Sequence, residues 1–445
     1  MDPQSAVAAA LGGDKTALIT LLRGRLGWSR EDVAPVGRGD AEATARAHAA
    51  IAALVQGRRG APLVPTVVGE HDEMTLAQLR RCLDHEDAVA GAICADGHRG
   101  HSQPVGGVVA YREHISVSGV GYDIACGNLA VETSLPYGAV RGRAGAFLDA
   151  IWNRVSFGVG RKNAARVDHP LFDDEDAWRA ADAVGLKGMA RGQLGTVGAG
   201  NHYVDLFHEV RPGVPAHACP VWVGIHFGSR GLGHKLATQY LKRGGGRDGM
   251  NQPPTLLHQD SDLGRGYLAA MEVAGRYAYA GREWVAGQVL DVLGGEEVSR
   301  VHNHHNFAWR EQVAGAPAWV IRKGCTPAFA GRRGFVGGSM GDDAVILEGV
   351  EGETTTALLH STVHGAGRVF GRNQAKRTFT RAQMEAWLRG RGVALRGGDV
   401  DESPMAYRRL PDVLARHAGT VRVLHTLRPF AVAMAGAGEV DPYKD

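Results

Sequence analysis

Potential metal ligands stand in five short stretches of the sequence, and four of these stretches also contain glycine. The stretches are GVGYDIACGN, GAGNHYVDL, GIHFGSRGLGH, HNHHNFAW and HGAGRV. The first has D-x-x-C spacing, which lets a carboxylate and a thiolate converge from one turn. A cysteine combined with several histidines and one aspartate suits a borderline or soft divalent ion such as Mn²⁺, Zn²⁺ or Co²⁺. The candidate ligands are Asp123, Cys126, His202, His226, His305 and His364.

Cys126 decides which metal chemistry such a site could support. Mg²⁺ prefers oxygen and normally avoids thiolate. A thiolate can bridge two ions, and two-metal sites suit displacement at phosphorus because they stabilise both the attacking and the leaving oxygen. Two alternatives stay open: Cys126 as a small buried hydrophobic residue, and each histidine as a structural one. The placement of these five stretches in loops, four of them containing glycine, favours one shared site.

The stretch HSTVHGAGRVFGRNQAKR places His364 directly before two glycines and a series of cations. Gly365 and Gly367 let backbone N–H groups come close to a ligand, because no Cβ stands in the way. The cations that follow could face a polyanion. The alternative is a tight loop followed by a basic helix with a solvated face. The cations are Arg368, Arg372, Lys376 and Arg377.

Composition limits the class of protein. The 445 residues include 63 glycines and 20 histidines, and the formal net charge is only +3. Any nucleic-acid contact must therefore come from a local patch of charge. Five widely spaced cysteines form no disulfide framework and suit a reducing compartment. Residues 1–30 lack a signal-peptide layout and no apolar stretch is long enough to span a membrane, so we expect a cytoplasmic protein.

The order of apolar runs predicts a small helical N-terminal extension over residues 1–60 and one large α+β domain over residues 61–445. Helical spacing appears in DKTALITLLRGRLG and RAHAAIAALVQGRRG, and again over residues 264–285 and 403–419. Residues 105–123 favour paired strands, and single buried strands are expected at 220–228, 317–324 and 342–349. The segment 420–435 predicts a terminal strand or strand pair. Strands and helices occur without the regular β-α-β alternation of an α/β fold, which indicates the α+β class.

Taken in order, these motifs resemble those of the RtcB-type RNA-splicing ligases. The resemblance runs from about Asp96 to Tyr407, and HTLRPFAVAMAG extends it to about residue 436. It is carried by the D-x-x-C-G and G-N-H elements, followed by RKG, GSMG and HGAGR in that order. The other carriers are ADGHRGHSQPVGGVVAY, HFGSRGLGH, HHNFAWRE and DESPMAYRRL.

The resemblance implies a single large RtcB-like domain with a glycine-loop-lined metal cleft, and a specific reaction. Such ligases join RNA ending in a 2′,3′-cyclic phosphate or 3′-phosphate to RNA bearing a 5′-hydroxyl, using GTP and Mn²⁺, in RNA repair or tRNA splicing. His364 matches the family's guanylated histidine, which would form a histidine–GMP intermediate. An archease-like activator is an implied partner. The positions matching ligands of two Mn²⁺ ions are Asp123, Cys126, His202, His226 and His305.

The resemblance also implies two groups of binding residues. Those expected to hold the nucleotide are Asn201, Asp205, Asn306, Ser339, Gly367 and Tyr407. Tyr407 is expected to stack on guanine. Those expected to hold RNA phosphates are Arg230, Arg322, Lys323, Arg368, Arg372 and Lys376. For Arg322 and Lys323 an exposed hairpin pair is an equal alternative.

The sequence departs from the family pattern around the nucleotide. Met434 stands where a C-terminal lysine is expected, and Lys444 in the tail AGEVDPYKD is a candidate substitute. Asp205 stands where a longer glutamate is common, and Gly371 where serine is common. GSMG is followed by the acidic residues Asp342 and Asp343, which add negative charge near the expected phosphate site.

Two further function classes fit the same residues. A metal-dependent phosphoesterase could open cyclic phosphates without joining ends, and it would need the metal ligands but not His364. A non-catalytic protein could bind RNA ends with a salt-dependent affinity. The full set of matched ligands together with His364 favours the ligase.

Overall fold

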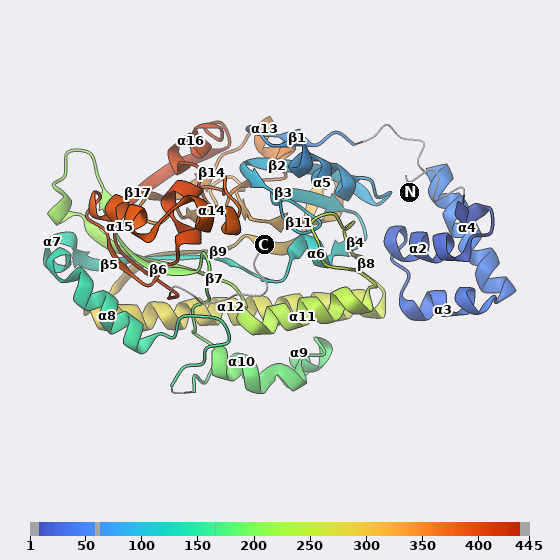
Figure 1. Ribbon diagram of the computed structural model, residues 1–445, viewed down its shortest axis with the longest axis horizontal. Helices are drawn as coiled ribbons and strands as arrows, with labels where there is room; N and C mark the ends of the chain where they lie inside the picture. Colours follow the sequence, from blue (N-terminus) through green and yellow to red (C-terminus); the bar gives the residue numbers. More distant parts are fainter. Residues whose placement is uncertain (1–8, 58–62, 165, 437–445) are drawn as a thin grey trace.

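The computed structural model describes residues 9–57, 63–164 and 166–436, and it confirms the α+β class (Figure 1). Three helices come first: α2 (Lys15–Arg25), α3 (Arg30–Arg38) and α4 (Ala41–Gly57). They enclose a hydrophobic cluster of their own that includes Leu18, Leu22 and Ile51. Helix α3, which the sequence analysis did not predict, is stabilised at its start by a capping box between Ser29 and Asp32. The boundary predicted at residue 60 falls outside the described residues.

The larger sheet carries one wall of the candidate site. In the described part of the chain it has eight strands in the order β13-β14-β17-β6-β7-β5-β9, with β16 also paired to β17. Its strands are β5 (Gly127–Pro136), β6 (Tyr203–Val210), β7 (Pro220–Phe227), β9 (Glu297–His304), β13 (Arg333–Val336), β14 (Ala344–Gly349), β16 (Ala394–Arg396) and β17 (Val421–Met434). The predicted terminal segment is thus one long strand, and its register shifts between Pro429 and Ala431.

Alternation along these strands separates a helix-covered face from a cleft face. Val223 and Ile225 of β7 share a core with α8 (Ala144–Arg154) and α12 (Asp262–Leu293). Because side chains alternate along a strand, His226 points to the opposite face. The same alternation on β6 puts Tyr203 and Asp205 there. Helices α12 and α11 (Arg230–Arg243) run side by side beneath the sheet in Figure 1.

The second wall comes from a five-stranded sheet in the order β1-β2-β3-β11-β10. Its strands are β1 (Thr66–Val67), β2 (Ala88–His98), β3 (Val105–Tyr111), β10 (Asn306–Val313) and β11 (Ala316–Lys323). The sequence predicted paired strands within 105–123, and this pairing is wrong. Strand β3 pairs with β2 and β11, whereas β4 (His114–Ser116) pairs with β8 (Leu256–His258). The link between β3 and β4 carries Arg112 and Glu113, with no turn glycine to fold one strand back on the other.

Shorter elements complete the molecule. Strand β12 (Cys325–Pro327) pairs with β15 (Ser361–Val363), which leads into His364. The helices not yet named are α5 (Glu73–Leu83), α6 (Val117–Val120), α7 (Tyr137–Val140), α9 (Glu175–Ala180), α10 (Lys187–Gln193), α13 (Glu353–Ala357), α14 (Arg372–Thr378), α15 (Arg381–Arg389) and α16 (Leu410–Ala415). The helix expected over 403–419 is shorter, because Pro411 restricts its start to Leu410. No helix in the described ranges is long and apolar enough to cross a membrane.

Candidate active site

A cleft of about 640 Å³ lies between the two sheets, where the glycine-rich loops meet. The larger sheet contributes the cleft faces of β6, β7 and β17. The smaller sheet contributes the ends of β2, β10 and β11, and β15 adds the loop that begins at His364. Residues from every one of the five predicted stretches line this one cleft. These include Asp123, Cys126, His202, His226, His305 and His364.

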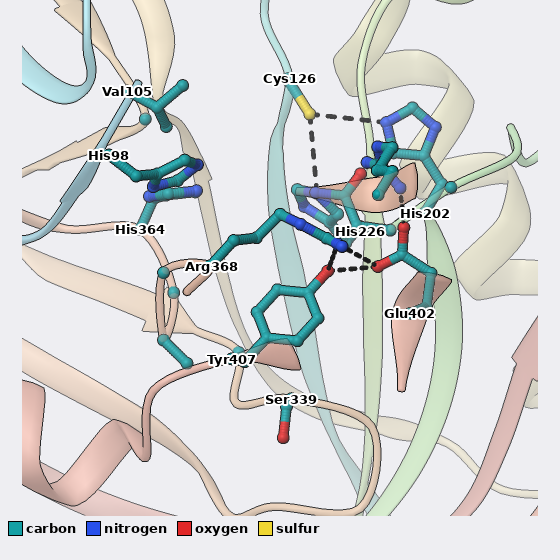
Figure 2. A pocket seen from close by; sticks show the side chains of 18 of the residues that line it. His98, Val105, Cys126, His202, His226, Ser339, His364, Arg368, Glu402 and Tyr407 are labelled. Atoms are coloured by element: carbon teal, nitrogen blue, oxygen red, sulfur yellow. Dashed lines mark hydrogen bonds and ion pairs between the residues drawn. The ribbon is translucent and has the colours of Figure 1, made fainter. Parts of the chain in front are cut away.

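Three of the predicted ligands meet closely, and the name metal cluster is used here for Asp123, Cys126, His202, His226 and His305. The ligand atoms of Cys126, His202 and His226 all lie within 4.8 Å of one another. The Sγ of Cys126 is 3.7 Å from Nε2 of both histidines (Figure 2). Asp123 joins them through Oδ2, which is 3.0 Å from Nε2 of His202. His305 stands next to His226, with 5.2 Å between ring centroids.

Local backbone geometry brings Asp123 and Cys126 together. The N–H of Cys126 donates to the carbonyl of Asp123 at 3.0 Å, closing the D-x-x-C turn. Ala125 inside that turn has φ of 60°, a left-handed conformation that costs a non-glycine residue free energy and that often occurs at functional sites. A Cβ on Gly228 would lie 2.2 Å from Oδ1 of Asp123, so only glycine allows this approach.

Neighbouring groups fix how the histidines face the cluster. Nδ1 of His226 donates to Oδ1 of Asn128 at 2.7 Å, so its Nε2 lone pair is directed at Cys126. Arg230 lies 3.3 Å from Nδ1 of His202. The fully buried Arg282 donates to the carbonyls of Ala125 and Phe227 at 3.1 and 2.5 Å, which ties the D-x-x-C turn to the end of β7.

The protonation states of the cluster favour a bound cation. Burial lowers the pKa of His226 and of His305 well below the ordinary value, so both are neutral and able to ligate. Burial and the charge of Asp123 raise the pKa of the Cys126 thiol well above its usual range. Thiolate formation there needs a positive charge from outside the protein. Nδ1 of His305 is buried with no hydrogen-bond partner among the described residues, a cost that a ligated ion would remove.

His364 is held in one tautomer by a buried aspartate. Its Nδ1 donates to Oδ2 of Asp96 at 2.7 Å, and its own backbone N–H donates to the same oxygen at 3.0 Å. Asp96 is fully buried. Because Nδ1 donates its proton to Asp96, this tautomer leaves the lone pair for nucleophilic attack on Nε2. The rings of His305 and His98 flank it at 5.0 and 6.5 Å (Figure 2).

The opposite side of the cleft carries an arginine–carboxylate network, the name used here for Arg368, Arg372, Asp401, Glu402 and Tyr407. Glu402 is 3% exposed and accepts hydrogen bonds from Arg368 and Tyr407 (Figure 2). It also accepts one from Arg372. Arg372 also lies 3.1 Å from Asp401. Burial alone would raise the pKa of Glu402, but the charges of Arg372 and Arg368 outweigh it and lower that pKa to about 2. The network is therefore ionised and internally paired.

Comparison with known proteins decides the family. The family model described as tRNA-splicing ligase RtcB matches residues 78–435. The chain belongs to the RtcB family. Helices α2–α4 precede the matched residues. The resemblance predicted from the motifs is thus confirmed.

Curated relatives named as RtcB ligases cover about three quarters of the chain. The tRNA-splicing ligase RtcB of Thermococcus kodakarensis is 29% identical over 418 residues, which cover 77% of this chain and 86% of the relative. The RNA-splicing ligase RtcB of Escherichia coli K12 is 27% identical over 373 residues, covering 76% and 88%. That of Mycobacterium tuberculosis is 29% identical over 414 residues, covering 75% and 94%.

The residues expected to hold a nucleotide in this RtcB family member all line the cleft: Asn201, Asp205, Asn306, Ser339, Gly367 and Tyr407. Asp205 projects from β6 opposite Val432 of β17, and Met434 lies two residues further along that strand. Oδ1 of Asp205 is buried without a hydrogen-bond partner in the described part of the chain, and burial raises the pKa of this carboxyl well above its usual range. A ligand with donor groups would satisfy it. Lys444, the candidate substitute for the missing lysine, lies outside the described residues.

The residues expected to hold RNA phosphates are scattered. Arg368 and Arg372 belong to the network, and Lys376 is 2.7 Å from Asp399. Arg230 adjoins His202. Arg322 is fully buried and bidentate to Glu311 at 2.7 and 2.9 Å, so the structure does not bring its guanidinium to the cleft. Lys323 lines the cleft but is only 5% exposed. The alternative of an exposed Arg322–Lys323 hairpin pair is therefore wrong.

The acidic residues after GSMG do not leave unbalanced charge in the cleft. Asp342 accepts from Ser339 at 2.7 Å and lies 2.7 Å from Arg409. Asp343 is bidentate to Arg428, with both contacts at 3.0 Å. Each added carboxylate thus has its own arginine, which removes the expected conflict with a phosphate.

Sequence reasoning missed Asp96, Arg282 and Glu402. Asp96 was inside a motif that carried the resemblance, and its pairing with His364 spans 268 residues. An acidic residue beside glycine in ADGHRG was the available signal. Arg282 is hidden in the apolar pattern of a long helix. Glu402 stood in DESPMAYRRL five residues before Tyr407, but its role as a buried acceptor follows only from the fold.

Proposed function

We propose that this protein is an RNA ligase that uses GTP and Mn²⁺ to join RNA ending in a 3′-phosphate or 2′,3′-cyclic phosphate to RNA bearing a 5′-hydroxyl. The observation that carries the proposal is the His364–Asp96 pair beside the metal cluster. A histidine oriented by a buried carboxylate, with its second nitrogen facing a cleft, is arranged to act as a nucleophile. Family membership supports the reaction class.

The first step is nucleotidyl transfer to His364. Its Nε2 attacks the α-phosphorus of GTP, a P–N bond forms, the bond from that phosphorus to the bridging oxygen breaks, and pyrophosphate leaves. The imidazole ring gains positive charge during this attack. Asp96 stabilises that charge through its hydrogen bond to Nδ1 and keeps the ring in the productive tautomer.

The next two steps transfer GMP and close the RNA chain. An oxygen of the RNA 3′-phosphate attacks the phosphorus held by His364, the P–N bond breaks, and the RNA end carries GMP through a new P–O–P link. The 5′-hydroxyl of the second strand then attacks the 3′-phosphorus, and GMP leaves with the bridging oxygen while the hydroxyl proton is released. An RNA with a cyclic phosphate first needs opening by water.

The metal cluster fits Mn²⁺ by its donor set. Two Mn²⁺ ions held by Asp123, Cys126, His202, His226 and His305 would neutralise negative charge on the phosphates and on the departing oxygen. The neutral histidines and the unpartnered Nδ1 of His305 support this assignment. The nucleotide would lie toward Asp205, Ser339 and Tyr407, with its base beside Met434.

A metal-dependent phosphoesterase would use the same cluster but would not need His364. A non-catalytic RNA-end-binding protein would need neither the cluster nor the histidine. The Asp96–His364 pair favours the ligase over both, because Asp96 orients His364 as a nucleophile, a role that neither alternative requires. A cytoplasmic location is supported by five buried free cysteines. An archease-like activator remains a prediction from the family.

The decisive experiment is intact mass after incubation with Mn²⁺ and each of the four nucleoside triphosphates. We expect a GMP-sized increase with GTP in the wild type and in His258→Ala, a control histidine 40% exposed in its side chain, and none in His364→Ala. An AMP-sized increase would show that the base preference differs. No adduct with any nucleotide, together with hydrolysis of cyclic phosphate by His364→Ala, would identify the phosphoesterase instead.

A further inference from the structure

One end of the main cleft takes no part in the steps proposed above, and it is named the His98 end here. In Figure 2, His98 and Val105 lie on one side of His364, whereas Tyr407 and Ser339 lie on the other. Strand register pairs Val105 with His98, and Gln78 of α5 joins the carbonyls of Gly100 and Met250. The cleft residues of the His98 end are Asp72, His98, Arg99, Val105 and Met250.

Arg99 is the cation of the His98 end, and it lacks a carboxylate partner. Within the described ranges no carboxylate forms an ion pair with Arg99, and its buried Nε has no hydrogen-bond partner. The other cations that line the cleft are engaged: Arg368 and Arg372 pair with carboxylates of the network, and Lys323 donates to a backbone carbonyl at 2.8 Å. Arg99 is thus the lining cation with donors available for an external anion.

Asp72 is the acidic residue of this end, but its oxygens serve the start of α5. Oδ1 accepts from the backbone N–H groups of Met74 and Thr75, both at 3.0 Å, and Oδ2 accepts from the Thr75 hydroxyl at 2.6 Å. Burial raises the pKa of Asp72, but these hydrogen bonds and the charge of Arg99 outweigh it and lower that pKa. Asp72 therefore acts as an ionised helix cap and leaves the guanidinium of Arg99 to a ligand.

The backbone on both sides of Arg99 is fixed. Before it, Nδ1 of His98 donates to the carbonyl of Asp96 at 3.0 Å. After it, the N–H of Gly100 donates to Oε1 of Gln78 at 3.1 Å, and the amide nitrogen of Gln78 donates back to the Gly100 carbonyl. The Gln78 side chain that makes both contacts is only 2% exposed. A cation on a fixed backbone loses less conformational freedom when it binds an anion.

We propose that Arg99 binds a backbone phosphate of the RNA strand that ends in the 3′-phosphate. This inference rests on the proposed function. The 3′-phosphate has to reach the GMP held by His364, so this strand enters the main cleft. Because the nucleotide lies toward Tyr407 and Ser339, the His98 end is the side left for the strand. The planar fork of an arginine suits a phosphate, which it can bind through two hydrogen bonds.

The distance from His364 indicates which phosphate Arg99 binds. The rings of His98 and His364 stack with 6.5 Å between centroids and 27° between planes, and Arg99 is the next residue along β2 and its loop. The reacting 3′-phosphate lies at His364 itself. Arg99 is set back from it by the width of the His98 ring, so its partner is a phosphate further upstream in the strand.

The test compares Arg99→Ala with Arg416→Ala by fluorescence anisotropy of an oligoribonucleotide that ends in a 3′-phosphate. Arg416 is an exposed arginine that does not line the cleft, so its variant should bind like the wild type. Arg99→Ala should weaken binding about tenfold, the effect of one lost hydrogen bond to a charged group. Its slope of log affinity against log salt should fall by about 0.7, for one lost contact to a single strand. Arg99→Lys keeps the charge and should restore the slope, but not the full affinity.

A neutral backbone position identifies the phosphate that Arg99 binds. Oligoribonucleotides are prepared in which a methylphosphonate replaces one backbone phosphate at a time. In the wild type, replacement of the contacted phosphate should weaken binding as much as Arg99→Ala does. In Arg99→Ala that replacement should have no further effect, because both changes remove the same contact. Replacement at other positions should weaken both proteins equally.

Three results would overturn this assignment. Wild-type affinity and salt slope in Arg99→Ala would show that Arg99 contacts no RNA phosphate. In joining assays, a rise in KM confined to the 5′-hydroxyl strand would assign Arg99 to the other strand. A fall in formation of the histidine adduct as large as the fall in joining would place Arg99 at the nucleotide. If wild-type protein forms no adduct, the proposed ligase function fails, while anisotropy still decides whether Arg99 binds a backbone phosphate.

Discussion

The metal cluster and the arginine–carboxylate network face each other across one cleft but differ in charge balance. The network contains its own counter-charges, because Arg368 and Arg372 are matched by Asp401 and Glu402. The metal cluster does not: burial lowers the pKa of His226 and of His305 and raises the pKa of the Cys126 thiol, so these three groups add no charge to balance that of a ligand. The charges of the network are balanced within the folded protein, whereas the polar atoms of the metal cluster would be satisfied only by a bound cation.

This difference assigns separate tasks to the two sides. Buried charges that are paired and hydrogen-bonded hold a wall of the cleft in a fixed shape. Buried ligands without a counter-ion provide affinity for one, because binding removes the cost of their unmet polar groups. Substitutions in the metal cluster should therefore affect chemistry, and substitutions in the network should affect stability.

The largest expected effect is that of Cys126→Ala on metal binding. Loss of a central ligand should weaken Mn²⁺ affinity by more than about a hundredfold, since even residues that only orient ligands contribute 10- to 100-fold. Titration calorimetry with Mn²⁺ measures it, and thermal unfolding should change little. Cys219→Ala is the matched control, because Cys219 is also buried but does not line the cleft, and its Sγ lies 3.7 Å from the Pro215 carbonyl. Unchanged Mn²⁺ affinity in Cys126→Ala would place the metal elsewhere.

Next in size is the effect of Arg372→Met on stability. Removing Arg372 leaves Glu402 and Asp401 buried with fewer counter-charges, which should lower the free energy of unfolding by about 3 kcal/mol. Urea denaturation measures it, with Arg377→Met on the same helix as control, because Arg377 is exposed. Mn²⁺ affinity should be retained in both. A change below about 1 kcal/mol would show that the network does not need this arginine.

The depressed pKa of Glu402 predicts how the network responds to acid. Its folded pKa of about 2 lies below the ordinary value near 4.3, so ionised Glu402 stabilises the fold above the ordinary pKa. That contribution is lost as the pH falls from about 5 toward 2. The free-energy difference between wild type and Glu402→Gln should be constant from pH 7 to 6 and shrink by pH 3. A difference that grows on acidification would have the wrong sign for this mechanism.

The metal cluster could be predicted from the sequence more completely than the arginine–carboxylate network. Every residue of the metal cluster could be proposed, because all but His305 stand in short motifs that also contain glycine and whose residue types have few other uses. The cations of the arginine–carboxylate network could also be identified from the sequence, but the carboxylates that pair with them could not. Arg322 and Arg368 look alike as charges in a sequence, yet one is fully buried against Glu311 and the other lines the cleft.

Long-range pairing explains what could not be predicted. The contact between Asp96 and His364 depends on β2 and β15 ending at the same point, and strand order was not available from local patterns. The same limit produced the wrong pairing of β3 with β4. Apolar alternation locates a strand and its buried face, but its neighbours are set by the packing of the whole domain.

The smallest expected effect concerns Arg428 and tests whether exposure, rather than pairing alone, separates the two kinds of ion pair. Arg428 and Asp343 form two contacts of 3.0 Å, as short as the 3.1 Å contact between Arg372 and Asp401, but their side chains are 53% and 30% exposed. Water screens such a pair, so Arg428→Ala should lower the free energy of unfolding by less than about 1 kcal/mol. Added salt should reduce this difference further.

Because Asp343 carries an unbalanced charge near the GSMG loop in Arg428→Ala, formation of the histidine adduct should slow slightly at low salt and recover at high salt. A loss as large as that of Arg372→Met would mean that geometry alone determines the strength of these pairs, and the contrast drawn from burial would not hold.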